Sequence, residues 1–199
     1  MAMLRLLTPA DFHSMPWKNG AGRTTEIAVH PEGATLDAFD WRVSIAEVER
    51  DGPFSRFPGV DRTIVLLGGA GMHLRSSVRE VELATRFAPE EVSGDDAIEC
   101  ALVGGPCRDF NAMFRRGRAR GRVAVVRDTD MDFDPALFRL VFAATGKHEC
   151  IVAGRPSLRI DGGHALLVGA PDHRDEAALI RIRPLDDGAV ALVVSVAMP

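Results

Sequence analysis

The chain has 199 residues, with 24 lysines and arginines against 28 acidic side chains and a net charge of −4. This length fits one all-β domain or two small fused halves. Hydrophobic residues make up 46% and charged residues 26%, which excludes wholesale disorder. The mild acidity argues against a nucleic-acid-binding protein, because phosphate binding needs a basic face.

Two further features bound the location and the chemistry of the protein. No apolar run approaches the roughly 20 residues of a membrane-spanning helix, and the amino terminus turns polar at Thr8 without a signal-peptide pattern. The cysteines, Cys100, Cys107 and Cys150, include no C-x-x-C pair, which argues against a disulfide framework or a thiolate zinc site. We therefore expect a cytoplasmic protein that does not bind membranes.

The first element predicted along the chain is a short helix. Thr8 is a capping residue, Pro9 suits the first helical position, and Asp11 follows the cap by three positions. The helix is predicted to start there and to end near residues 15–16.

Residues 15–27 form the most unusual segment, with an indole, an ammonium and an amide beside several glycines. The order of a phosphate-binding G-x-x-x-x-G-K-[ST] loop is missing, so we reject a nucleotide loop. Lys18 and Asn19 suit a small carboxylate or amide ligand, and the glycines allow close backbone approach. The alternative is a tight Asn-Gly turn with Trp17 packed into the core.

Residues 39–46 alternate apolar with polar side chains, which predicts a strand that carries Arg42 and Ser44 on one face. If the apolar face packs between sheets, Arg42 and Ser44 point to solvent, and the residues alone favour this interpretation. If the strand lines a barrel, the same two side chains point into a cavity and can hold an anion.

Short strands dominate the rest of the chain. The runs are 63–67, 123–126, 137–144, 150–152, 158–160, 165–168, 178–183 and 189–196. We expect a hairpin that joins 158–160 to 165–168 across Asp161-Gly162-Gly163, and a second hairpin that joins 178–183 to 189–196. Many short strands separated by Gly and Pro predict a sandwich or a barrel, and the break at 104–106 separates two β-rich halves.

The segment after this break carries polar side chains for which two interpretations remain open. Asp109 and Asn111 are interpreted as turn-capping residues, with a ligand-facing role as the alternative, and residues 109–116 as one or two turns of helix. The arginines between Arg115 and Arg122 are interpreted as a solvated strand edge, with anion binding as the alternative. The six histidines show neither H-x-H nor H-E-x-x-H spacing, so we expect no bound metal.

Four ordered blocks of sequence together resemble the HutD/Ves family. The blocks are Met15-Pro16-Trp17-Lys18-Asn19-Gly20 with the residues up to Ile27, Phe39-x-Trp41-Arg42-Val43-Ser44-Ile45-Ala46, Asp51-Gly52-Pro53-Phe54-Ser55-x-Phe57-Pro58-Gly59-Val60-Asp61-Arg62, and Gly105-Pro106-x-Arg108-Asp109-Phe110-Asn111-x-Met113. They cover about residues 4–117, whereas the carboxyl-terminal third matches only as a pattern of strands.

The resemblance implies an all-β, cupin-type barrel, that is, a double-stranded β-helix or jelly roll, with two cupin-like halves in one chain. Residues 1–199 are then a single HutD-like cupin unit, with an internal boundary expected near 104–122. It also implies a bacterial cytoplasmic protein associated with histidine utilisation, and a homodimer is a further expectation. Its implied role is to bind a small anionic metabolite of histidine breakdown, such as urocanate or a formylated or formiminated glutamate, without catalysis and without a cofactor.

In a cupin barrel, strand residues alternate between the interior and the outer surface, so the resemblance implies a ligand-binding set. Its members are Trp17, Lys18, Asn19, Glu26, Arg42, Ser44, Arg62, Asp109 and Asn111. The cations and amides are implied to be donors for an anion, and Trp17 an apolar wall. Glu26 either orients a cation or binds an imidazole or formimino N–H, and Asp109 orients its neighbours. A metal-independent isomerase or amidohydrolase acting on such a metabolite remains the alternative.

Overall fold

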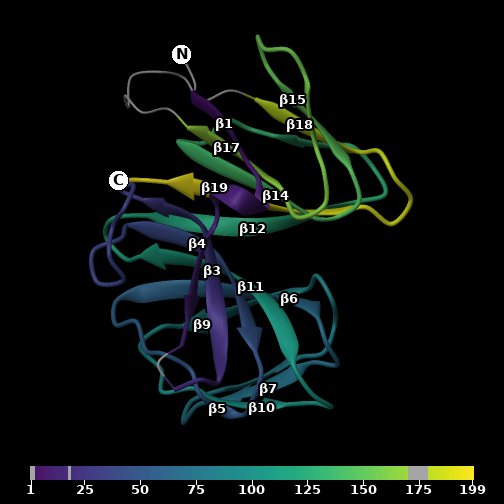
Figure 1. Ribbon diagram of the computed structural model, residues 1–199. Coiled ribbons are helices and arrows are strands. Elements are labelled where there is room, and N and C mark those ends of the chain that lie inside the picture. Colours follow the sequence, from purple (N-terminus) through teal and green to yellow (C-terminus); the bar gives the residue numbers. More distant parts are fainter. Residues whose placement is uncertain (1–2, 18, 170–178) are drawn as a thin grey trace. The chain divides into compact units, whose positions relative to one another are not determined.

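A computed structural model describes residues 3–17, 19–169 and 179–199 (Figure 1). The chain divides into two compact units. The central unit is Phe12–Arg120, and the terminal unit combines the residues up to Asp11 with Gly121–Pro199. Among the described residues, no helix is long and apolar enough to cross a membrane. The expectation of one HutD-like unit over residues 1–199 stays a prediction.

The central unit consists of two antiparallel sheets whose inner faces share one core. The larger sheet has the order β2-β3-β4-β11-β6-β9 and the smaller the order β5-β10-β7-β8. The bounds are β2 (His13–Pro16), β3 (Gly22–His30), β4 (Trp41–Val48), β5 (Gly52–Pro53), β6 (Val60–Gly68), β7 (Met72–Arg75), β8 (Glu80–Leu83), β9 (Pro89–Ser93), β10 (Glu99–Leu102) and β11 (Cys107–Arg115). Ile64 and Leu66 from the larger sheet and Met72 and Leu74 from the smaller belong to the same buried cluster.

The terminal unit repeats this plan with sheets of five and four strands, ordered β1-β17-β14-β19-β12 and β13-β18-β15-β16. The bounds are β1 (Met3–Leu7), a 3₁₀ turn η1 (Pro9–Asp11), β12 (Arg120–Arg127), β13 (Met131–Phe133), β14 (Phe138–Thr145), β15 (His148–Val152), β16 (Leu158–Ile160), β17 (Ala165–Gly169), β18 (Ile180–Pro184) and β19 (Val190–Ala197). The purple strand β1 joins this unit because it pairs with β17 along its full length (Figure 1).

The strands β4 and β6 confirm the predictions for residues 39–46 and 63–67. Residues 63–67 are buried on both faces, as a continuous run of apolar side chains requires. In β4, Trp41, Val43 and Ile45 alternate with Arg42 and Ser44, and all five side chains are buried. The interpretation in which Arg42 and Ser44 face solvent is therefore wrong, because both side chains are buried and point into a cavity of the central unit.

The two predicted helices are wrong in extent or in kind. The cap at Thr8 is present, since the Thr8 backbone N–H and hydroxyl both donate to Asp11 Oδ2 at 2.8 Å, but the helix ends at Asp11 after one turn. Residues 13–16 pair instead with β3 as strand β2. Residues 109–115 belong to β11, whose neighbours β4 and β6 hold it in register on both sides, and Arg116 begins the turn that follows.

The two predicted hairpins are also wrong. Strand β16 pairs with β15, whereas β17 pairs with β1 and β14 in the other sheet. Strands β18 and β19 separate in the same way, and Ala178, where the first was expected to begin, lies outside the described residues. The turns lie where the glycines predicted them, but each carries the chain across to the facing sheet, because both strands need an apolar partner across the core.

Candidate functional site

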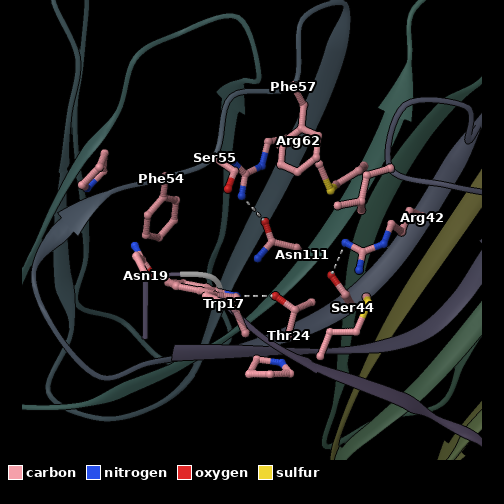
Figure 2. Close-up of a pocket in the computed structure, with 16 residues that line it drawn as sticks. Trp17, Asn19, Thr24, Arg42, Ser44, Phe54, Ser55, Phe57, Arg62 and Asn111 are labelled. Carbon is pink, nitrogen blue, oxygen red and sulfur yellow. Dashed lines mark hydrogen bonds between the residues drawn. The ribbon is translucent and has the colours of Figure 1, made fainter. Parts of the chain in front are cut away.

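The central unit contains a cavity of about 490 Å³ between its sheets and two loops. It is lined by Met15, Pro16, Trp17, Asn19, Thr24, Leu36, Arg42, Ser44, Ala46, Pro53, Phe54, Ser55, Phe57, Arg62, Asn111 and Met113. Arg42, Ser44, Arg62 and Asn111 come from β4, β6 and β11, and the aromatic side chains come from the loop between β5 and β6 and from the loop before β3 (Figure 2). The site is thus a small apolar chamber with a few fixed polar groups, the usual form of a small-molecule site.

Arg42 lies at one side of the cavity and is held by a carboxylate. Its Nε donates to Glu26 Oε2 at 2.6 Å and its Nη1 to Ser44 Oγ at 3.3 Å. The side chain of Arg42 is 5% exposed and that of Glu26 is 19% exposed, so the pair is largely shielded from water. The positive charge of Arg42 is therefore balanced within the protein.

Arg62 is the second buried cation of the cavity, and it has far fewer partners. Its guanidinium carbon lies 5.6 Å from the ring centres of both Phe54 and Phe57. One Nη donates to Asn111 Oδ1 at 2.7 Å (Figure 2), while Nε has no hydrogen-bond partner among the described residues. Burial lowers the pKa of Arg62 to about 10, although the charge of Asp109 opposes this shift. A guanidinium with unused donors in a closed space is poised to accept an anion.

Asp109 stands behind Asn111 on the same face of β11. The Asn111 side-chain amide donates to Asp109 Oδ1, and the other carboxyl oxygen, Oδ2, has no partner among the described residues. Asp109 is completely buried, and burial raises its pKa to about 7 against the opposing effects of Arg62 and Asn111. Arg62, Asn111 and Asp109 thus form a continuous line from the cavity wall into the core.

The loop before β3 supplies the apolar side of the cavity. The Trp17 indole N–H donates to Thr24 Oγ1 at 2.8 Å, which fixes the ring across the cavity (Figure 2). Asn19 Oδ1 accepts from the backbone N–H of Ala21 at 3.0 Å and so shapes the turn. Gly22 is required here, because a Cβ atom at this position would lie 2.1 Å from the carbonyl oxygen of Glu47 on β4.

The position of Trp17 provides a first testable consequence. An occupant of the cavity lies against the indole, so binding is expected to change the Trp17 fluorescence. Replacing Thr24 with valine removes the indole hydrogen bond and is expected to cost about 1 kcal/mol of stability. Fluorescence titration and urea unfolding measure the two effects. A ligand-dependent signal that persists in Trp17→Phe would place the change at Trp41 and contradict the assignment.

Of the predicted site residues, the structure brings most to one place. Trp17, Asn19, Arg42, Ser44, Arg62 and Asn111 line the cavity. Glu26 and Asp109 lie outside its lining but contact Arg42 and Asn111, respectively. Lys18 lies outside the described residues. Sequence reasoning did not assign Phe54 and Phe57 to the site, although both stand in the third block of the family resemblance, three residues apart and flanked by Pro53 and Pro58.

Three arginines of the cluster between Arg115 and Arg122 contact acceptors within the protein. Arg115 donates to the backbone carbonyls of Phe39 and Asp37, and Arg116 pairs with Asp61 and Asp95. Arg118 pairs with Asp40 at 3.2 Å. These three side chains tie the loops around β4, β6 and β9 together. Arg120 and Arg122 are exposed on β12, the edge strand of its sheet, which agrees with the interpretation as a solvated strand edge.

The terminal unit carries a buried arginine whose donors are already used. Arg139 donates to Ser195 Oγ at 3.2 Å and to the carbonyls of Phe133 and Asp134 at 3.4 and 2.7 Å. Its guanidinium carbon lies 5.0 Å from the ring centre of Phe133. Arg139 therefore resembles Arg62 in its aromatic contact, but its Nε, the donor that Arg62 keeps unused, donates to Ser195 Oγ.

The cavity does not have the donors of a metal centre or of a thiol nucleophile. Among the described residues, no three His, Cys, Asp or Glu side chains gather closely enough to hold a metal ion. Guanidinium groups donate only and cannot ligate a cation. Cys100, Cys107 and Cys150 are buried, and burial raises the pKa of Cys100 and Cys150 to about 12. The residues present therefore do not fit a cupin metal site.

The chain resembles known proteins in sequence and in fold. A model of the HutD family matches residues 9–181. The chain belongs to the HutD family. An uncharacterized 21.2 kDa protein in the hutC 3' region of Pseudomonas putida is 38% identical over 175 residues, which cover 84% of this chain and 92% of that protein. Protein Ves of Citrobacter koseri is 35% identical over 170 residues, covering 81% and 87%.

Solved structures show the same fold over the whole HutD-family chain. A conserved protein of unknown function from Pseudomonas aeruginosa PAO1 has a TM-score of 0.88 and 33% identity, covering 98% of this chain and 99% of that one. HutD from Pseudomonas fluorescens SBW25, solved in a formate condition, has a TM-score of 0.81 and 30% identity, covering 99% and 100%. Bacillus subtilis oxalate decarboxylase, at 7% identity and a TM-score of 0.61, shares the fold alone. The predicted all-β cupin architecture is confirmed.

Proposed function

We propose that the central unit binds a small carboxylate metabolite without transforming it, and that this HutD-family protein moderates histidine utilisation through that binding. The observation that carries the proposal is Arg62, a buried guanidinium on the cavity wall with an unused Nε. A buried cation without a counter-charge is costly, and an anionic ligand supplies one.

The charges around the cavity favour a single anionic group at Arg62. Glu26 already compensates Arg42 through a 2.6 Å ion pair. The direct partner of Arg62, Asn111, is neutral. Asp109 has its pKa raised to about 7 by burial, so near neutral pH it offsets the Arg62 charge only in part. A carboxylate at this end leaves the remainder of the ligand against Trp17, Phe54 and Phe57, which suits a flat or apolar group.

The candidate ligands are the small carboxylates of histidine breakdown. The support is the family itself and the position of the Pseudomonas putida relative in a hutC 3' region. Urocanate offers a planar ring beside its carboxylate, whereas formylglutamate and formiminoglutamate offer a second carboxylate and an amide-like group. The donors of the cavity accept either kind.

Isothermal titration of the purified protein with urocanate, formiminoglutamate, formylglutamate and glutamate tests the proposal. We expect at least one to bind with a dissociation constant below about 1 mM and a stoichiometry of one per chain. Arg108→Met is the matched control, because this arginine is exposed and lies on the opposite side of β11 from Arg62's partner Asn111. Absence of binding by all four compounds at millimolar concentration contradicts the proposal.

The alternative is a metal-independent isomerase or amidohydrolase in the same cavity. It has one favourable observation, since a carboxyl group with its pKa raised to about 7 suits acid–base chemistry at neutral pH. However, Asp109 does not line the cavity and contacts it only through Asn111. Turnover of a candidate metabolite by chelator-treated protein, lost in Glu26→Gln, would favour the enzyme.

A further inference from the structure

The line of side chains behind the cavity connects the anion site with a buried carboxyl group. Arg62 lies on β6, and Asn111 and Asp109 lie two residues apart on β11. Asn111 uses its oxygen for Arg62 and its nitrogen for Asp109, so its orientation is set from both ends. Asp109 Oδ2 has no partner among the described residues, and the residue is fully buried. A buried carboxylate left half unpaired is costly, whereas its protonated form is much less so.

The elements packed around Asp109 bring few charges to it. Strand β6 contributes Arg62, and β10 contributes Cys100, which interacts with Asp109 electrostatically. The cross-strand neighbours of Asp109 are Ala46 on β4 and Leu66 on β6, which are uncharged. Cys100 stays neutral because its thiol pKa is raised to about 12. Within the described part of the chain, Arg62 is therefore the cation that favours the ionised form of Asp109.

More distant groups act on these two neighbours rather than on Asp109 itself. Arg42 interacts with Arg62, and Asp51 and Glu99 interact with Cys100. Glu26 compensates Arg42 and so limits its effect. The charge state of Asp109 is thus governed by its burial and by whether the charge of Arg62 is available to it.

We propose that Asp109 takes up a proton when an anion binds beside Arg62, so that the cavity binds anions more tightly as the pH falls. The inference builds on the proposed function, since it needs an anion at Arg62. A bound anion compensates Arg62 and withdraws the one favourable charge from the Asp109 carboxylate, which then accepts a proton from water. The coupling is reciprocal. The factor by which a bound anion raises the proton affinity of Asp109 is also the factor by which a proton on Asp109 raises the anion affinity of the site at Arg62.

Burial raises the pKa of Asp109 to about 7 in the ligand-free protein, so we expect the coupling between anion binding and protonation to act near neutral pH. Proton uptake is expected where the free form is still ionised and the bound form is protonated. Couplings between neighbouring sites commonly amount to about 5- to 150-fold, and we expect about tenfold here because Asn111 separates the two charges.

Formate is the probe that tests the coupling, because its own charge is constant above about pH 6. Calorimetric titration of the whole protein near pH 7 in two buffers with different ionisation enthalpies measures the protons taken up per formate bound. We expect net uptake of part of one proton, and about tenfold tighter formate binding near pH 6 than near pH 8.5. The wild-type measurement decides the matter even where a variant fails to fold.

The variant Asp109→Asn carries the neutral, isosteric form permanently. It is expected to bind formate with the low-pH affinity at every pH and to take up no proton. Asp128→Asn is the matched control, since Asp128 is exposed and its positive φ of 57° tolerates asparagine, and it is expected to keep the wild-type pH dependence. Formate binding without proton uptake and without pH dependence overturns the inference and leaves the proposed function standing. Failure of formate and of all four metabolites to bind contradicts both.

Discussion

Replacing Arg62 with methionine is expected to weaken carboxylate binding by about 30- to 5,000-fold. Removing one partner from a buried, hydrogen-bonded charge pair costs about 2–5 kcal/mol, which corresponds to this factor. Methionine keeps an unbranched apolar stem between Phe54 and Phe57, so the aromatic packing survives. The measurement is calorimetric titration with the tightest-binding metabolite of the panel.

Two variants make the Arg62 result specific. Arg62→Lys keeps the charge but loses the planar fork, and we expect it to recover only part of the affinity. Arg108→Met removes an exposed arginine of the same sheet and is expected to bind like the wild type. Unchanged affinity in a folded Arg62→Met protein would show that the anion binds elsewhere.

Replacing Asp109 with asparagine is expected to raise the free energy of unfolding by about 2–4 kcal/mol at pH 8.5 and to leave it nearly unchanged near pH 4. The pKa of Asp109 is raised from 3.8 to about 7 in the folded protein. Between these values the folded state holds a proton that the unfolded state has lost, so wild-type stability falls as the pH rises and levels off above about pH 7. The asparagine variant does not titrate and escapes this loss.

Urea unfolding of both proteins at pH 4, 6 and 8.5 measures this difference. Asp128→Asn again serves as the control, because an exposed aspartate that is isolated from the core contributes little to the pH dependence. A variant that is less stable than the wild type at pH 8.5 would mean that Arg62 needs the Asp109 charge more than burial penalises it. That outcome would also remove the physical basis of the proton coupling.

The strands that position the site were partly predictable from the sequence. The alternation in β4 identified Arg42 and Ser44 as sharing one face, but the same alternation describes a solvated sheet and a barrel wall equally well. Only the resemblance to a cupin favoured the cavity, and the burial of both side chains agrees with it. The local alternation predicts which side chains share a face of the strand. Whether that face contacts solvent or a cavity depends on how the whole sheet packs in the folded unit.

The interpretation of residues 109–116 as helix shows a different limit. Asp109, Asn111 and Met113 alternate with Phe110, Ala112 and Phe114, which is the period of a strand. The polar character of Asp109 and Asn111 suggested a turn, because these residue types are common there. In the structure the strand lies between β4 and β6, and its polar side chains are paired with each other and with Arg62. Tertiary pairing therefore overrides the local preference.

The hairpins failed for a related reason. The glycines around Asp161 predict a turn correctly, but a turn does not specify whether the next strand returns to the same sheet. In both cases the following strand pairs in the facing sheet. Long-range pairing decides this, and it is set by which apolar faces must be covered. The partners of Arg62 could not be predicted for the same reason, since Phe54, Phe57 and Asn111 meet only across the folded unit.

A crystal structure of the protein with the tightest-binding carboxylate of the panel tests the assignment of the anion site to Arg62 most directly. We expect carboxylate density in the cavity of the central unit, with an oxygen within hydrogen-bond distance of the Arg62 guanidinium and the remainder of the ligand against Trp17 and Phe54. A ligand seated in the terminal unit or on the outer surface, with the Arg62 guanidinium still uncompensated, would contradict it.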